Sequence, residues 1–160
     1  MSAIELTATG ADEMRAIGAR LAQALMAMPG DEPLLLTLSG DLGAGKTTLV
    51  GGLLRALGHA GAARSPTYTL IEPYRLQQRD VLHCDLYRLR HPDELDDLGL
   101  RDLRTPGSLL LVEWPEKAAG RLGAADVELY LAYATPEARR LRIDAARTAA
   151  GRSLLALLAA

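Results

Sequence analysis

Residues 33–50 read PLLLTLSGDLGAGKTTLV, in which a short apolar run leads straight into a glycine-rich loop. The apolar run, residues 34–38, is typical of a strand that is covered on both faces, as in a parallel sheet. The loop matches G-x-x-x-x-G-K-[ST] from Gly40 to Thr47, and a helical stretch follows it to about Leu57. Strand, loop and helix in this succession predict an α/β fold with a phosphate-binding loop.

The residue types in the loop suit a nucleotide phosphate. Gly43 and Gly45 allow backbone conformations and close approaches that a side chain would block. Successive backbone N–H groups can then converge on phosphate oxygens beside the positive end of the helix. Lys46 neutralises β- and γ-phosphate charge, and the Thr47 hydroxyl is expected to ligate Mg²⁺. The expected nucleotide-binding residues of the loop are Asp41, Gly43, Ala44, Gly45, Lys46, Thr47 and Thr48.

Two observations bear on whether this loop is only a glycine-rich turn before an ordinary helix. Of the 18 basic residues, only Lys46 and Lys117 are lysines, so a chain that otherwise uses arginine has a lysine after the last loop glycine. Lysine is a compact point charge, whereas arginine is a broad planar fork. The strand, the lysine and the threonine all stand in register with the loop. We therefore predict nucleotide binding.

The remaining sequence predicts a single domain. Helical periodicity covers residues 9–28, and a short helix is expected from Pro92. Strands are expected at residues 66–76 and 81–85 as a hairpin, at 109–113 as a second buried strand, and at 127–133 and 140–145 as an antiparallel pair. The fold expected for residues 1–147 is a P-loop three-layer sandwich with a mixed central sheet, a parallel core plus antiparallel strands. Residues 148–160 are expected to form a helical C-terminal extension.

Bulk properties exclude several classes of protein. The net charge of −2 over 160 residues argues against direct DNA binding through bulk electrostatics. Cys84 is the only cysteine, which leaves no internal disulfide and no CxxC pair for zinc. The N-terminus lacks the pattern of a signal peptide, and the terminal LLALLAA is far shorter than the roughly 20 apolar residues of a membrane span. We expect a soluble cytoplasmic protein without a membrane partner.

A P-loop protein needs an acid at the end of a neighbouring strand, to hold Mg²⁺ directly or through water. Asp85 in VLHCDLY and Glu113 in LLLVEWP both end apolar runs. Glu113 follows the more apolar strand, and Asp85 could orient the attacking water or hold a metal-bound water. Either acid could instead cap its strand or pair with Arg88.

Three other positions have two interpretations each. Trp114, the only tryptophan, could pack near the nucleotide or belong to the apolar core or its rim. Thr67 in SPTYTL could sense the γ-phosphate as switch threonines do, or be an ordinary turn or strand residue. His83 and Cys84 are adjacent on a predicted strand, so their side chains point to opposite faces and cannot share a metal or nucleophile site.

Three activities fit a phosphate-binding loop of this kind: an ATPase, a small-molecule kinase and a nucleotide-dependent binding switch. The chain has no asparagine, so it lacks the N-K-x-D guanine motif, and ATP is favoured over GTP. A small-molecule kinase would need a lid with arginines and an acceptor pocket. Residues 115–125 supply only Lys117 and Arg121, which is thin support for a lid.

The chain resembles the TsaE (YjeE) family, ATPases required for tRNA threonylcarbamoyladenosine biosynthesis. Five blocks in family order and spacing carry the resemblance: GDLGAGKTT at 40–48, SPTYTLIEPY at 65–74, DLYRL at 85–89, L-x-x-LGLRD ending at Asp102, and LVEWPEK at 111–117. Together they cover residues from about 5 to 145. Five blocks are much more specific than the loop alone.

The resemblance implies an ATPase that is slow in isolation and that hydrolyses Mg-ATP for the TsaB–TsaD pair. TsaD transfers a threonylcarbamoyl group to adenosine 37 of tRNA, and contact with tRNA is expected only through that complex. The resemblance implies catalytic roles for Lys46, Asp85 and Thr67, the last in a switch-I-like segment. It implies Mg²⁺ ligation by Thr47 and Glu113, and a position near the nucleotide for Trp114.

Overall fold

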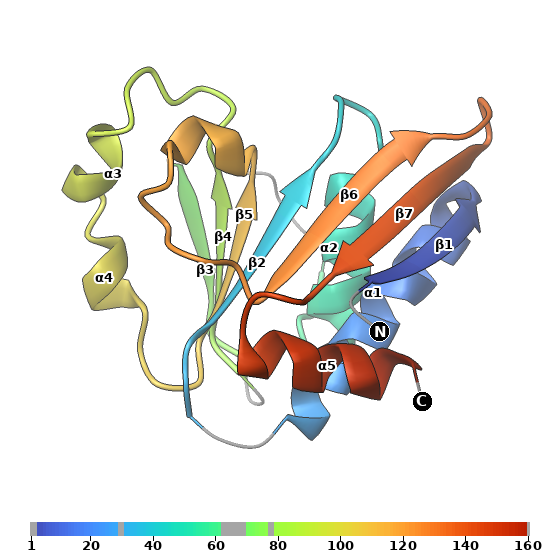
Figure 1. Ribbon diagram of the computed structural model, residues 1–160, viewed down its shortest axis with the longest axis horizontal. Coiled ribbons are helices and arrows are strands. Elements are labelled where there is room, and N and C mark those ends of the chain that lie inside the picture. Colours follow the sequence, from blue (N-terminus) through green and yellow to red (C-terminus); the bar gives the residue numbers. More distant parts are fainter. Residues whose placement is uncertain (1–2, 29–30, 62–69, 77–78, 160) are drawn as a thin grey trace.

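The computed structural model describes residues 3–28, 31–61, 70–76 and 79–159. These residues form a seven-stranded sheet in the order β1-β7-β6-β2-β5-β4-β3 (Figure 1). The central strands β6 (Val127–Tyr133), β2 (Leu34–Ser39), β5 (Leu109–Glu113) and β4 (Val81–Asp85) are mutually parallel. The outer strands β1 (Ala3–Thr9), β7 (Ala138–Asp144) and β3 (Ile71–Tyr74) pair antiparallel with their neighbours. The predicted mixed sheet with a parallel core is confirmed.

Helical segments cover both faces of this sheet. Alternate residues of β2 divide between two apolar clusters, with Leu36 beneath helices α1 (Gly10–Ala27) and α2 (Lys46–Ala56) and Leu35 on the opposite face. The opposite face carries α3 (Glu94–Asp97), α4 (Leu100–Leu103) and the 3₁₀ helix η1 (Pro115–Ala118). This arrangement is the predicted three-layer sandwich. None of the helices among the described residues has the length and apolar character needed to cross a membrane.

Helices α1 and α2 approach each other closely because each has a glycine at the contact. A Cβ atom on Gly52 of α2 would lie 2.2 Å from the carbonyl oxygen of Arg15, and one on Gly18 of α1 would lie 2.2 Å from that of Leu49. Glycine inside a helix costs about 1 kcal/mol relative to alanine. The close backbone contact explains Gly52 and holds α2, with the loop before it, against α1.

The C-terminal helix α5 (Ala149–Ala159) packs against α1. The guanidinium of Arg20 donates to the carbonyl oxygen of Leu158 at 3.1 Å. At the start of α5, the Thr148 hydroxyl accepts a hydrogen bond from the N–H of Gly151 at 2.9 Å and donates to Asp126 at 2.6 Å. These contacts join α5 to the sheet through the segment before β6.

Two local features differ from the sequence-based expectation. Strand β1 was not predicted, because only Ile4, Leu6 and Ala8 mark its inner face; it forms along β7 with Ala3 opposite Asp144. The helix expected from Pro92 is divided into α3 and α4, since Gly99 between them has a φ of +67°. The prediction of a hairpin strand at residues 66–76 is confirmed for Ile71–Tyr74, which pair with β4, and residues 66–69 lie outside the described part of the chain.

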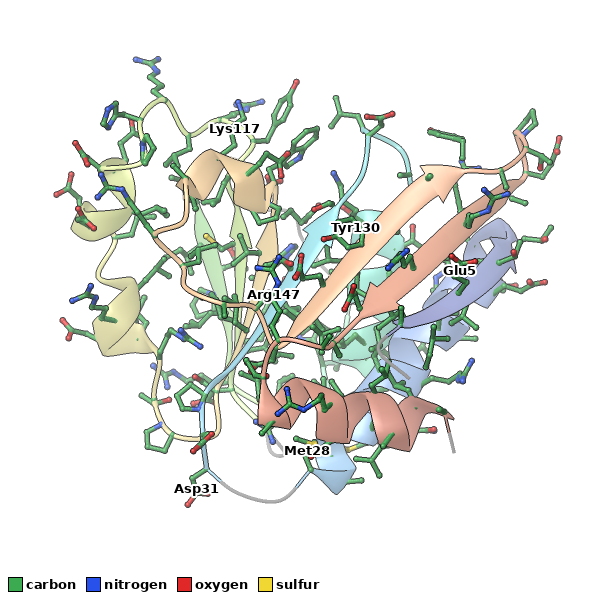
Figure 2. All side chains as sticks on the ribbon, viewed as in Figure 1. Glu5, Met28, Asp31, Lys117, Tyr130 and Arg147 are labelled. Carbon is green, nitrogen blue, oxygen red and sulfur yellow. The ribbon has the colours of Figure 1, made fainter. Side chains whose placement is uncertain are left out.

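The outer face of β6, β7 and β1 is polar, and Figure 2 shows Glu5 and Tyr130 on it. Tyr130 donates its phenolic hydrogen to Glu128, and this bond, aided by burial, raises the pKa of Tyr130 to about 12. Arg147 contacts the same carboxylate at 2.9 Å. On this face the Glu128 carboxylate is therefore held by both Tyr130 and Arg147.

Candidate nucleotide-binding site

The site is built where the carboxyl ends of three parallel strands meet. Strands β2, β5 and β4 are neighbours in the sheet, so their last residues lie at one edge, from which the glycine-rich loop also leaves. The register sets Glu113 beside both Leu38 of β2 and Asp85 of β4. Glu113 therefore lies between the strand that leads into the loop and Asp85.

The loop conformation requires its glycines. Gly45 caps the start of α2 with a φ of +106°, and Gly43 has a φ of +82°, both in the left-handed region. Side chains would also meet neighbours, since a Cβ on Gly45 would lie 2.8 Å from the Met14 methyl and one on Gly43 2.6 Å from the Tyr133 hydroxyl. The loop turns on a hydrogen bond of 3.0 Å from Ala44 N–H to the Asp41 carbonyl.

A cavity of about 240 Å³ lies in front of this loop. Its lining residues are Leu42, Gly43, Gly45, Lys46, Thr47, Thr48, Asp85, Tyr87, Glu113 and Trp114. Most of the predicted site residues thus surround one space. Of the other predicted loop residues, Ala44 is buried and Asp41 is exposed, and neither lines the cavity. Thr67 lies outside the residues that the structure describes.

Lys46 is held inside the loop by two contacts. Its Nζ atom donates a hydrogen bond to the carbonyl oxygen of Gly40 and lies 4.1 Å from the centroid of the Trp114 ring. An ammonium at this distance from an indole face makes a cation–π contact. The lysine charge is therefore fixed in the wall of the cavity, close to the loop.

Trp114 adopts a backbone conformation that is rare for a bulky residue, with φ 58° and ψ 52°. Such a conformation costs on the order of 1–3 kcal/mol and persists where surrounding contacts enforce it. Here its N–H donates to the Leu38 carbonyl at 3.3 Å, and its ring meets Tyr87 with centroids 5.1 Å apart. The tryptophan lines the cavity and also packs on the apolar cluster beneath α3 and α4.

The two acids differ in their surroundings. Burial raises the pKa of Asp85, and the nearby Glu113 charge adds to that effect, whereas a hydrogen bond of 3.0 Å from the Tyr87 N–H opposes it. Glu113 is only 3% exposed, and its Oε2 lies 2.6 Å from Nε2 of His83. An acid with a perturbed pKa in a cleft, beside a second acid, is a candidate for proton transfer or metal binding.

Two residues of the site were not predicted from the sequence. Tyr87 contributes its ring to the cavity wall and its N–H to Asp85. His83 contacts Glu113, and its side chain and that of Cys84 point to opposite faces as predicted. The available signal was spacing: His83 stands two residues before Asp85 on one strand, so both belong to the same face.

The oxygen donors of the cavity fit Mg²⁺. Thr47, Asp85 and Glu113 offer a hydroxyl and carboxylates, the hard ligands that this ion prefers. Among the described residues, no three His, Cys, Asp or Glu side chains gather into a metal cage of their own. Mg²⁺ usually binds through one or two carboxylates together with substrate phosphates, so a cage of three is not required here.

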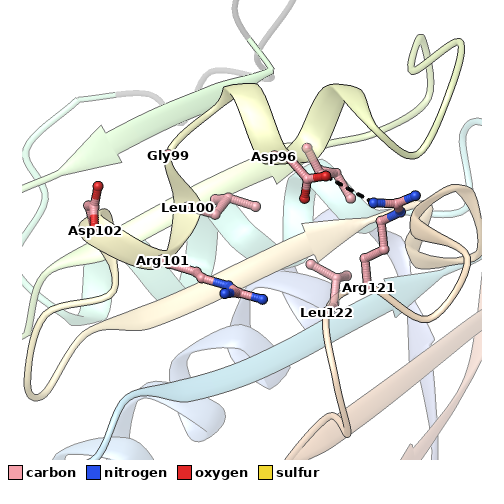
Figure 3. A pocket seen from close by; sticks show the side chains of 8 residues that line it. Asp96, Gly99, Leu100, Arg101, Asp102, Arg121 and Leu122 are labelled. Atoms are coloured by element: carbon pink, nitrogen blue, oxygen red, sulfur yellow. Dashed lines mark hydrogen bonds and ion pairs between the residues drawn. The ribbon is translucent and has the colours of Figure 1, made fainter.

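Two of the other hollows formed by the described residues are larger than this cavity. One of about 400 Å³ adjoins the loop on its other side. It is lined by residues of the loop, of the starts of α1, α2 and β7, and of the β6–β7 turn: Gly10, Ala11, Met14, Gly43, Gly45, Thr48, Pro136, Glu137 and Arg139. The other, of about 610 Å³, lies beside α3 and α4 and contains the ion pair of Asp96 and Arg121 at 3.0 Å (Figure 3). No predicted site residue lines this larger hollow.

Comparison with known proteins agrees with the resemblance. The family described as "Threonylcarbamoyl adenosine biosynthesis protein TsaE" matches residues 8–141. A protein of Haemophilus influenzae named "tRNA threonylcarbamoyladenosine biosynthesis protein TsaE" is 39% identical over 142 residues, which are 89% of each chain. Its namesake from Streptomyces coelicolor is 41% identical over 136 residues, 83% of this chain and 80% of that one.

A solved structure extends the likeness to three dimensions. The crystal structure of YdiB from Bacillus subtilis matches with a TM-score of 0.77 and 26% identity, covering 99% of this chain and 96% of that one. The family match includes the loop and both acids at the strand ends. This chain therefore belongs to the TsaE family of threonylcarbamoyladenosine biosynthesis proteins.

Proposed function

We propose that this chain binds Mg-ATP in the cavity at the loop and hydrolyses it in support of the TsaB–TsaD pair during threonylcarbamoyl transfer to adenosine 37 of tRNA. One observation carries the proposal. The loop lysine and threonine face the same space of about 240 Å³ as two carboxylates from neighbouring strands. Membership of the TsaE family supplies the pathway.

The phosphates would lie against the loop. The backbone N–H groups at the start of α2 and the Lys46 ammonium offer positive charge to the β- and γ-phosphates. Thr47 and Glu113 would hold Mg²⁺, which offsets phosphate charge when bound. We expect Asp85 to orient the attacking water and to accept its proton; in support, Asp85 lines the same cavity and burial raises its pKa.

The base end of the nucleotide has room on the other side of the loop. The hollow of about 400 Å³ shares Gly43, Gly45 and Thr48 with the phosphate cavity. Its remaining wall comes from the start of α1, from Pro136 and Glu137, and from Arg139, whose guanidinium stacks on Tyr133 at 3.9 Å. A nucleotide could thus pass over the loop from one hollow to the other.

Exposed side chains at the mouth of the cavity favour a partner protein that covers the site. Leu42 is 64% exposed and Tyr87 is 44% exposed, and both line the phosphate cavity. Exposed apolar side chains at the rim of a site are suited to a protein surface that covers it. An uncovered site admits water freely, which weakens electrostatic catalysis. We therefore expect slow turnover by the isolated chain.

Phosphate release tests the proposal. The purified chain should release phosphate from Mg-ATP slowly, and TsaB–TsaD should accelerate the release. Lys46→Ala should abolish both the slow and the accelerated release of phosphate. In a separate capture assay, immobilised TsaB–TsaD should retain different amounts of the unmodified chain in ATP, in ADP and without nucleotide. Rapid labelling of a small acceptor by γ-labelled ATP would instead identify a kinase. Nucleotide-dependent capture without any phosphate release would identify a binding switch.

A further inference from the structure

His83 joins the nucleotide site to the core of the molecule. It lies on β4 two residues before Asp85, on the same face as Val81, which packs beneath α1 and α2. Its side chain is fully buried, with 0% exposed. Neither the loop motif nor the acids at the strand ends account for an imidazole at this position.

Among the described residues the imidazole has one hydrogen-bond partner, and that partner is an acid of the cavity. Nε2 of His83 lies 2.6 Å from Oε2 of Glu113, across the neighbouring strands β4 and β5. We assign the ring hydrogen to Nε2, because the Glu113 carboxylate that would bind Mg²⁺ can only accept. Hydrogen bonds to a charged acceptor are short and roughly twice as strong as neutral ones. The bond therefore restrains one oxygen of a side chain that lines the phosphate cavity.

The state of the other ring nitrogen indicates that packing in the core is not the whole role of His83. Nδ1 is buried and has no hydrogen-bond partner among the described residues. An unsatisfied buried polar group costs about 1–3 kcal/mol. The other residues of β4 that are buried with it are apolar or cysteine, and an apolar side chain at this position would avoid that cost. Compared with an apolar side chain, the imidazole gains one hydrogen bond within the described part of the chain, the bond to Glu113.

We propose that His83 is a positioning residue that holds Glu113 in one orientation for binding Mg²⁺ with the nucleotide. The proposal rests on the function proposed above. Groups that hydrogen-bond to a metal ligand typically change metal affinity 10–100-fold when they are removed. Loss of the Nε2–H donor should therefore weaken Mg²⁺ binding to the ADP complex by this factor. ADP binding in the absence of metal should not change.

The experiment compares variants that present an N–H donor at different places in the side chain of residue 83. Glutamine presents its amide near the place of Nε2, whereas asparagine presents it near the place of Nδ1, away from Glu113. Calorimetric titration of ADP at a series of Mg²⁺ concentrations, and in EDTA, separates metal affinity from nucleotide affinity. His83→Gln should keep most of the Mg²⁺ dependence, and His83→Asn and His83→Leu should lose 10–100-fold in Mg²⁺ affinity. Cys84→Ala is the matched control, because Cys84 is equally buried but faces the other way.

The outcomes are distinct. Equal Mg²⁺ dependence in the unmodified chain and His83→Asn would overturn this proposal alone. An equal loss of ADP affinity with and without Mg²⁺ would show general damage and would also overturn it. If the unmodified chain does not bind ADP, the proposed function fails, and this proposal fails with it. If His83→Leu does not fold, the glutamine and asparagine variants alone decide, since both keep a polar side chain of similar size.

Discussion

At the scale of single residues, the catalytic role that we propose for Asp85 conflicts with the effect of its charge on stability. Burial raises its pKa above the ordinary value of 3.8, so the folded chain binds the Asp85 proton more tightly than the unfolded chain does. The stability from this group is fully present below the unfolded pKa and is lost as the pH rises through the raised folded pKa. At neutral pH the ionised carboxylate therefore lowers the free energy of unfolding.

Asp85→Asn should make the protein more stable and less active. The amide removes the buried charge, while its oxygen can still accept the hydrogen bond from the Tyr87 N–H. We expect a higher midpoint of thermal unfolding at pH 7, with the difference from the unmodified chain shrinking as the pH approaches 4. Phosphate release should fall by about 10²–10⁴-fold if Asp85 acts as a general base. Unchanged release with TsaB–TsaD present would contradict that role.

At the scale of secondary-structure elements, the contact of α1 with α2 sets where the loop lies. Gly52→Ala tests this contact. Helix propensity predicts that the substitution raises the free energy of unfolding, whereas packing predicts that it lowers it. Alanine is the better helix former by about 1 kcal/mol, but its Cβ would lie 2.2 Å from the Arg15 carbonyl oxygen. Overpacking of this kind usually costs about 1–3 kcal/mol, so we expect a net loss in the free energy of unfolding by urea.

A substitution in the opposite direction provides the control for Gly52→Ala. Ala16 lies on the exposed side of α1, and Ala16→Gly should cost about 1 kcal/mol through helix propensity alone. A gain in stability from Gly52→Ala would show that the two helices can separate without penalty. The close packing would then not be what holds the loop.

Which elements could be predicted from the sequence depends on whether their determinants are local in the chain. Continuous apolar runs predicted β2 and β5, and local glycine, lysine and threonine chemistry predicted the loop, because each depends on neighbours in the chain. Strand β1 could not be predicted in this way, since it depends on the edge of β7, whose paired residues lie 129 to 141 positions later in the chain. The bond of His83 to Glu113 likewise depends on β4 and β5 being neighbours, which a spacing of 30 residues does not reveal.

At the scale of the whole molecule, the single cysteine reports on opening of the fold. Cys84 is 0% exposed in β4, inside the sheet between β5 and β3. Burial, together with the nearby Asp85 charge, raises its pKa to about 12. Because the thiolate is the reactive form, alkylation near pH 8 requires the chain to open around β4. Modification should therefore be slow in the folded protein and fast in urea.

Nucleotide binding should slow this modification further. A ligand that binds only the folded chain stabilises it by RT ln(1 + [L]/Kd), about 2.7 kcal/mol at a concentration 100 times Kd. If alkylation requires global unfolding, Mg-ADP at that concentration should lower the rate of iodoacetamide labelling about 100-fold, as measured by intact mass. Lys46→Ala is the control, because it should abolish the protection while leaving Cys84 in place. Protection much below 100-fold in the unmodified chain would mean that β4 opens locally while the nucleotide stays bound. Equal protection in Lys46→Ala would show that the loop lysine is not needed for binding.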